Sequence, residues 1–199
     1  MQLRTFSIMQ PNLIDIPKEF YPFESAEPFK ECMVCGIDLT LGTIDYFVEK
    51  AVKNNVEYQV QDIVFEYAIC SACAHTMQQS ISKESQQNMQ AFFTNRQAFM
   101  SKMQAYQRGE GEPLEELISR CALYGEPITE MSEYMMLGHF RGGKMITTTM
   151  PYIMGGKAMD ELSGLMSNET IDEMNKFKDQ YFGGPVELEG LWKGKPVFL

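Results

Sequence analysis

Alternating apolar and polar positions mark one segment of the chain as extended. In VEYQVQDIVFEYAIC, apolar side chains recur at every second position, but their phase changes near Gln61 and Asp62. Such alternation is typical of a strand with one buried face, and a change of phase indicates a bulge or a bend. Two consecutive asparagines just before this segment predict a turn, so residues 45–69 are expected to form a hairpin. The stretch 45–53 could equally be a short helix.

Helical periodicity follows the extended segment. Ser82 is a suitable N-cap, and apolar side chains then recur every three or four residues as far as Arg108, with Gly109 as the stop. This pattern predicts one long amphipathic helix that packs on the protein's own core. The alternative is an adaptable surface of Met and Phe side chains for a partner. Near the other end of the chain, KMITTTMPYIM predicts a threonine-rich strand, followed by helices near 157–165 and 168–182.

Two cysteine pairs flank the extended segment. Four of the five cysteines form C-x-x-C pairs, Cys32 with Cys35 and Cys70 with Cys73, and 34 residues separate the pairs. Two residues between thiolates let one tight turn present both sulfurs to a single ion, so two such turns can complete a tetrahedral shell. Gly36 suits the first turn, because glycine adopts positive φ without steric cost. Four soft thiolates favour zinc, with iron as the rival, and predict one structural ion per chain.

The order of these elements resembles the treble-clef, or zinc-ribbon-like, group of zinc fingers. A cysteine knuckle is followed by a hairpin and then by a second cysteine pair at the start of a helix, over about residues 30–95. The resemblance implies metal binding by the four cysteines and nothing more. The group includes DNA binders, ubiquitin ligases, ribosomal proteins and protein-interaction modules, so it does not specify a function.

A later segment repeats this order with one cysteine. At a constant offset of 85 positions, residues 67–92 and 152–177 share five identities in 26 positions, and CALYG precedes the second block as CMVCG precedes the first. Cys121 then corresponds to Cys32. The other three ligand positions carry residues without sulfur, namely Tyr124, Gly155 and Ala158. One thiolate cannot hold a structural zinc, so this unit is predicted to be metal-free and to depend on the first unit or on another subunit for stability.

The predicted architecture is α+β, with two treble-clef-like pseudo-repeats that each contain a knuckle, a β-hairpin and a helix. The first is expected to be zinc-bound and the second metal-free. The predicted boundaries are an N-terminal extension at 1–29, the zinc-binding unit with its long amphipathic helix at 30–109, the degenerate repeat at 110–184 and a tail at 185–199. The tail carries the only tryptophan, Trp192, and we expect it to fold back onto the domain rather than dock on a partner.

Composition and charge narrow the possible functions. The chain has 199 residues, of which 44% are hydrophobic, which is enough to build a core. It contains no apolar run long enough for a membrane span or a signal peptide, so a soluble cytoplasmic protein is expected. The formal net charge is −10, and both halves of the chain are acidic. No basic stripe is available to neutralise phosphates, which disfavours nucleic-acid binding.

Few residues suggest catalysis. The two histidines, His75 and His139, do not lie beside an obvious nucleophile in the sequence, and a Cys121–His139 pair would need the fold to bring distant residues together. The glycines and lysine at 154–157 lack the spacing of a phosphate-binding loop. We therefore expect a non-enzymatic zinc-binding protein that acts as a protein-interaction or scaffolding module, with an unidentified protein or a second copy of itself as partner.

Two other functions remain open at this stage. Cys70 and Cys73 at a helix N-terminus could form a thiol-redox centre of an enzyme or a sensor, because a helix N-terminus lowers a thiol pKa. A nucleic-acid-binding zinc finger is the third alternative.

Overall fold

The computed structural model describes residues 13–55, 57–58 and 60–182. In this part of the chain six strands form one antiparallel sheet in the order β1-β5-β4-β2-β3, with β6 also paired to β4. The strands are β1 (Leu13–Asp15), β2 (Asp45–Asn55), β3 (Val60–Cys70), β4 (Glu133–Arg141), β5 (Lys144–Ile146) and β6 (Tyr152–Gly155). With the helices, this sheet confirms the predicted α+β class.

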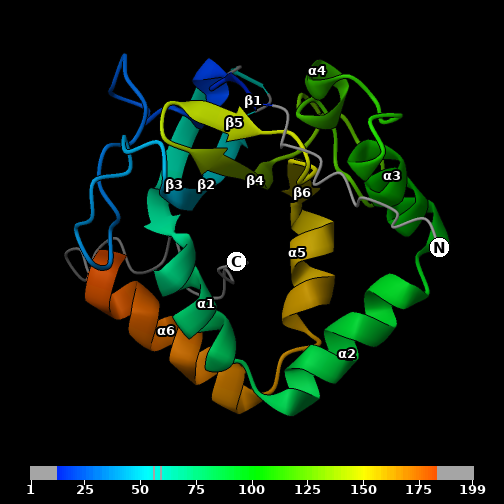
Figure 1. Cartoon of the computed structure of the whole chain (residues 1–199). Coiled ribbons are helices and arrows are strands. Elements are labelled where there is room, and N and C mark those ends of the chain that lie inside the picture. Colours follow the sequence, from blue (N-terminus) through cyan, green and yellow to red (C-terminus); the bar gives the residue numbers. More distant parts are fainter. Residues whose placement is uncertain (1–12, 56, 59, 183–199) are drawn as a thin grey trace, which may run out of the picture.

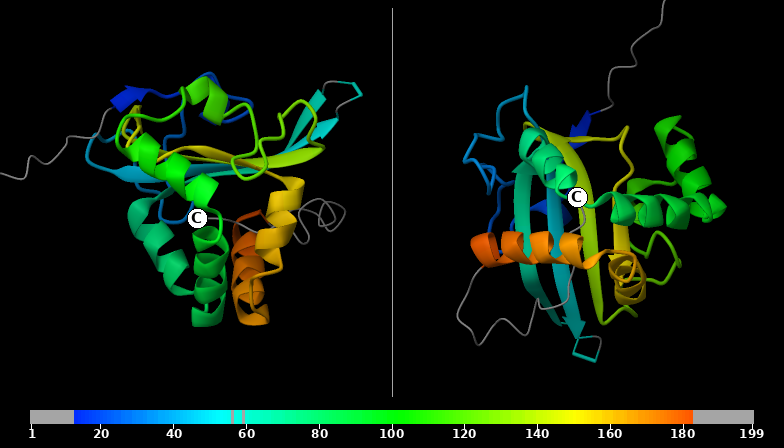
Figure 2. Two further views of the ribbon diagram at one scale, coloured as in Figure 1. Left: turned by 90° about the vertical axis from the view of Figure 1, so that its right-hand side faces the viewer. Right: turned by 90° about the horizontal axis from the view of Figure 1, so that it is seen from below.

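Helices α1 (Ser71–Gln79), α2 (Lys83–Thr94), α5 (Gly156–Ser163) and α6 (Asn168–Phe182) cover one face of the sheet (Figure 1). The other helices are α3 (Gln97–Gln107), α4 (Leu114–Leu117) and a short 3-10 helix at Lys18–Phe20. In Figure 1 the sheet lies at the top, and α1, α2, α5 and α6 lie below it. The edge-on view in Figure 2 shows the same two layers.

The predicted hairpin forms, because β2 pairs with β3 from Tyr46 to Asn55. Residues 45–53 are therefore strand and not helix. The bulge lies further along than expected: Ala51 pairs with Phe65 and Val52 with Ile63, so Val64 is the extra residue. The phase change at Gln61 and Asp62 predicted a bulge in this strand but placed it too early.

The predicted long helix is wrong, because α2 and α3 are separate helices. Ser82 caps α2 as expected, with its side chain accepting a hydrogen bond from the Ser85 backbone N–H. The chain leaves helical geometry at Arg96, where φ is −104° and ψ is 67°. The rings of Phe93 and Phe99 then approach to 5.4 Å. On a continuous helix, residues six positions apart would point in different directions, so the break allows both rings to pack together.

The predicted threonine-rich strand is also divided. β5 ends at Ile146 and β6 begins at Tyr152, and both pair with the same edge of β4. Pro151 lies between them, and proline cannot donate a backbone hydrogen bond to a sheet. The helices predicted near 157–165 and 168–182 are confirmed as α5 and α6.

The face of the sheet opposite the helices is covered by an aromatic cluster. Phe20 packs edge-on against Phe140 at 5.2 Å, and Tyr46 stacks on Phe140 at 5.3 Å. Gly138 makes this possible, since a Cβ there would lie 2.8 Å from the Phe20 ring. Burying one such phenylalanine contributes roughly 1.5–3 kcal/mol. The cluster thus fixes the N-terminal segment, which leads into the first cysteine pair, against the sheet.

Candidate metal centre

The first cysteine pair lies on a closed turn, which we call the first knuckle (residues 30–39). The Gly36 backbone N–H donates to the Cys32 carbonyl at 2.8 Å, and the Cys32 N–H donates to the Ile37 carbonyl at 3.0 Å. Gly36 has φ of 69°, the left-handed conformation that its position after the pair predicted. The Leu39 N–H donates to the Lys30 carbonyl at 2.8 Å and closes the base of the turn, so both sulfurs are presented from one loop.

The second pair lies at the junction of β3 and α1. Cys70 ends the strand and is the N-cap residue of the helix, and Cys73 lies in the first helical turn, as predicted. The knuckle is fixed to this strand by a hydrogen bond of 2.9 Å from the Met33 N–H to the Ala68 carbonyl. The two pairs, distant in sequence, are therefore brought together by backbone contacts that involve no cysteine side chain.

All four sulfurs converge. Each of the four Sγ atoms lies within 4.8 Å of the others, and the Sγ atoms of Cys35 and Cys70 are 3.8 Å apart. A tetrahedron with metal–sulfur bonds of about 2.3 Å has edges of about 3.8 Å. The cluster can therefore hold one metal ion in tetrahedral geometry. Cys32 and Cys70 are buried, whereas Cys35 is exposed, so the site lies at the surface with one open side.

The protein stabilises negative charge on only part of this cluster. Burial raises the pKa of Cys32, but backbone N–H groups of Cys70, Cys35 and Val34 outweigh it and lower that pKa to about 7. Burial raises the pKa of Cys70 and of Cys73. Adjacent thiolates repel one another, so full deprotonation of the four calls for a cation among them. The chemistry of the donor set thus agrees with its geometry.

Cys121 lies in a turn with the same hydrogen bonds, which we call the second knuckle (residues 119–128). The Gly125 N–H donates to the Cys121 carbonyl at 2.8 Å, and the Cys121 N–H donates to the Glu126 carbonyl at 2.7 Å. Gly125 has φ of 70°. The Ala122 N–H donates to the Ile153 carbonyl of β6 at 2.8 Å, as Met33 does to β3 in the first knuckle.

The sulfur of Cys121 has a counterpart contact as well. Its Sγ accepts the Gly155 N–H at 3.5 Å, as the Cys32 Sγ accepts the Cys70 N–H at 3.3 Å. The Gly155 amide is thus directed at a sulfur, which argues against a phosphate site at 154–157. Cys121 is only 2% exposed. It acts in packing and not as an accessible thiol.

Side-chain contacts occupy the place of a metal at the second knuckle. Tyr124 donates its hydroxyl hydrogen bond to Glu161 Oε2 at 2.6 Å, and the Lys157 ammonium lies 4.3 Å from the centre of the Tyr124 ring. Ala158 is fully buried. An aromatic ring, a cation and a methyl group therefore fill the region where the first knuckle has three further sulfurs.

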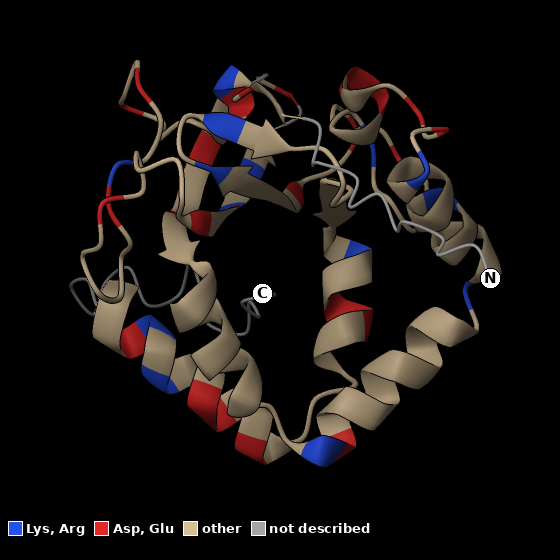
Figure 3. Ribbon diagram, viewed as in Figure 1, with Lys and Arg blue, Asp and Glu red and all other residues tan. Residues whose placement is uncertain are grey.

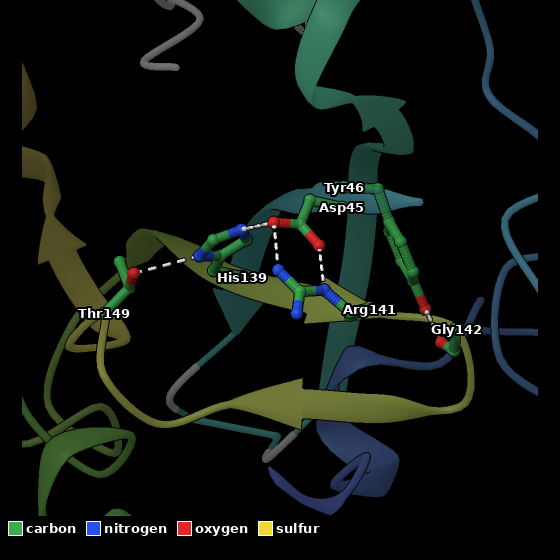
Figure 4. Close-up of polar contacts among 6 residues, drawn as sticks. All are labelled: Asp45, Tyr46, His139, Arg141, Gly142 and Thr149. Atoms are coloured by element: carbon green, nitrogen blue, oxygen red, sulfur yellow. Dashed lines mark hydrogen bonds and ion pairs between the residues drawn. The ribbon is translucent and has the colours of Figure 1, made fainter. Parts of the chain in front are cut away.

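The structure does not pair His139 with Cys121. His139 Nδ1 lies 2.9 Å from Thr149 Oγ1 (Figure 4). The His139 ring stacks on Phe47 at 4.6 Å. Its Nε2 lies 3.8 Å from Asp45 Oδ2, too far for a hydrogen bond.

The order Thr149, His139, Asp45 superficially follows a nucleophile, a base and an acid. The Asp45 carboxylate, however, is held by the Arg141 guanidinium through both oxygens. This network therefore joins β2 to β4, and His75, the other histidine, is exposed and contacts Gln79.

One polar cluster between the two halves was not predicted. Ser82 and Ser167 place their hydroxyl oxygens 2.8 Å apart, at the N-termini of α2 and α6. The Ser82 N–H donates to Thr170 Oγ1, and the Ser167 N–H donates to Ser85 Oγ. The identity of Ser82 and Ser167 in the aligned segments was the available signal, but it did not indicate that the two would touch.

Comparisons with models of known families, with curated proteins and with solved structures give no match. Among the residues that the structure describes, no helix is both long enough and apolar enough to cross a membrane.

Proposed function

We propose that the chain is a non-enzymatic cytoplasmic zinc-binding protein, in which a structural four-cysteine zinc site supports a protein-interaction or scaffolding module. The observation that carries the proposal is the convergence of four sulfurs within 4.8 Å of one another. A set of four thiolate ligands favours zinc over harder cations, and iron is the alternative metal. Four protein ligands complete the shell and leave no position for a substrate water, so the role of the ion is structural.

We also propose that the chain contains two treble-clef-like units, 30–109 and 110–184, and that only the first binds metal. The support is the set of matching hydrogen bonds in the two knuckles, at an offset of 89 positions, and in the elements after them, at an offset of 85. β2 and β4, one from each unit, pair along nine residues. This shared sheet would supply the stability that a metal-free unit lacks.

The charge distribution supports a protein partner over nucleic acid. Figure 3 shows acidic and basic residues together on α5 and α6, and no described helix is lined by basic residues. A zinc ion bound by four thiolates adds a formal charge of −2 to a chain that already carries −10. The electrostatic attraction on which binding to phosphates depends is therefore missing.

The thiol-redox alternative has less support. A redox dithiol needs only two cysteines, whereas the sulfurs of Cys70 and Cys73 lie within 4.8 Å of two further sulfurs from the first knuckle. Zinc retention under a mild oxidant would count against this alternative, and reduction of insulin by the protein would favour it.

Metal analysis tests the proposal. Atomic absorption on the full chain, purified without added metal, should give about one zinc per chain. The Cys32→Ser/Cys35→Ser variant should give none, and Cys121→Ser, which changes the equivalent sulfur of the second knuckle, should retain it. Absence of zinc, with all four thiols titratable in the native protein, would refute the proposal. A pull-down with the same three proteins, analysed by mass spectrometry, then asks whether partner binding requires the metal site.

A further inference from the structure

An apolar groove lies on the helical side of the molecule, and none of the four cysteines of the candidate metal centre lines it. It has a volume of about 320 Å³ and is bounded by α2, α3, α5, α6 and β6. Its described lining contains no charged residue. Six methionines contribute to it, namely Met89, Met100, Met103, Met154, Met166 and Met174. Figures 1 and 2 show the helices that form its walls.

The groove is suited to a few large apolar side chains. Its volume is at the lower end of the range for sites that hold small molecules, about 300–1,000 Å³, and is too small for a long helix. Methionine side chains are flexible and polarisable, so they adapt to an inserted ring and make favourable sulfur–aromatic contacts. An apolar surface of this kind is costly to leave in water and therefore calls for an occupant.

We propose that the C-terminal segment of the same chain occupies this groove, with Leu191 and Trp192 as its apolar anchors. Residues 183–199 lie outside the described residues, and α6 ends at Phe182. The sequence that follows, GGPVELEG, contains glycines, a proline and two glutamates beside Val186 and Leu188, and Leu191 and Trp192 come next. Two adjacent large apolar side chains after an eight-residue connection match a small apolar groove a short distance away. The inference is independent of the metal site.

The length of chain after α6 is sufficient. Phe182 packs on Phe65 and Tyr67 of β3, whereas the groove lies beneath Tyr152 and Met154 of β6. β2 and β4 separate these two strands, so the distance across the sheet is three strand spacings of about 4.8 Å, or about 14 Å. Eight linker residues span up to about 26 Å when extended. Leu191 and Trp192 can therefore reach the groove without any change in α6.

Because Trp192 is the only tryptophan, its fluorescence reports directly on the proposal. In the full chain we expect a blue-shifted emission and an acrylamide quenching constant several-fold lower than in urea. Met100→Glu and Met174→Glu each place a charge at a half-buried position of the groove and should restore quenching. Gln104→Glu adds the same charge at an exposed position of α3 and should behave as wild type. Circular dichroism and zinc content should be unchanged in all three variants.

Three results would overturn the proposal. Quenching of the native full chain as strong as in urea would show that Trp192 is not docked at all. Protection that persists in both Met100→Glu and Met174→Glu would place the segment elsewhere on the protein. Protection that disappears on dilution would show that the groove receives the segment of a second copy.

Discussion

The first and second knuckles have the same backbone and different contents. Each has a turn closed by the same hydrogen bonds, a glycine at φ near 70° and an N–H group directed at a sulfur. In the first, three further sulfurs complete a candidate metal site. In the second, a tyrosine, a lysine and a buried alanine pack together. The difference shows that the turn does not need a metal to adopt its shape when a neighbouring strand and side-chain packing hold it.

The largest loss of stability should come from substituting Cys35, and its counterpart Tyr124 in the second knuckle provides the comparison. Cys35→Ser should abolish zinc binding and lower the free energy of unfolding by at least about 3 kcal/mol, because the binding energy of structural zinc, about 10–16 kcal/mol in zinc-finger peptides, is folding energy. Tyr124→Ser at the corresponding position should leave the zinc in place. It removes the hydrogen bond to Glu161 and the contact with Lys157, at a cost of about 1–2 kcal/mol. Urea denaturation measures both, and equal losses would contradict the assigned roles.

Three substitutions should convert the second knuckle and the elements after it into a metal site like the first. With Cys121 in place, Tyr124→Cys, Gly155→Cys and Ala158→Cys together should create a second four-sulfur cluster and raise the zinc content from one to two per chain. At position 155 the closest obstruction to a Cβ is the Met131 sulfur at 2.6 Å, which belongs to a flexible side chain.

Metal analysis beside the double variant Tyr124→Cys/Ala158→Cys, which has one sulfur fewer, gives the control. One zinc in both proteins would show that the two backbones are not equivalent.

A third prediction concerns the turns themselves. Gly36→Ala and Gly125→Ala should each cost about 1–2 kcal/mol, since both glycines are left-handed and both have open space around the missing Cβ. The two costs should be equal within error in thermal or urea unfolding of the zinc-loaded protein. A much larger cost at Gly36 would mean that the metal fixes the first turn more tightly than packing fixes the second.

The smallest effect on stability should come from protonation of His139, on the β2–β4 strand pair that joins the two halves. Burial is the main cause that lowers the pKa of His139, with Arg141 acting in the same direction and Asp45 opposing. The folded protein therefore binds this proton less readily than the unfolded chain, so stability present above about pH 6.5 falls modestly as the pH decreases below it. The Arg141 hydrogen bond lowers the pKa of Asp45, so that carboxylate stays charged throughout this window.

His139→Gln should flatten the dependence of stability on pH between 7 and 5. His75→Gln, at an exposed position, should not. Urea denaturation across this range measures the slope, and an unchanged slope in His139→Gln would contradict the assignment.

Local patterns predicted much of the fold around the candidate site. The C-x-x-C spacing, the glycine after it and the alternation before Cys70 each depend on a few neighbouring residues, and the structure brings the four cysteines together as their spacing suggested. The N-cap at Ser82 and the boundaries of α5 and α6 are local in the same sense.

What the sequence did not predict depends on contacts between distant residues. The periodicity from Ser82 to Arg108 continues across Arg96, where the chain leaves helical geometry and the rings of Phe93 and Phe99 pack together. The pairing of β2 with β4 joins segments about ninety residues apart, and no local pattern specifies a partner at that separation. The reciprocal contact of Ser82 with Ser167 likewise exists only once both halves are folded.

X-ray absorption spectroscopy at the zinc edge, on the full chain as purified, shows whether four cysteine sulfurs bind one zinc ion. The expected spectrum contains four sulfur neighbours at about 2.3 Å and no nitrogen or oxygen in the first coordination shell. A shell with fewer than four sulfurs, or a protein that contains no zinc, would show that the four cysteines do not form a zinc site.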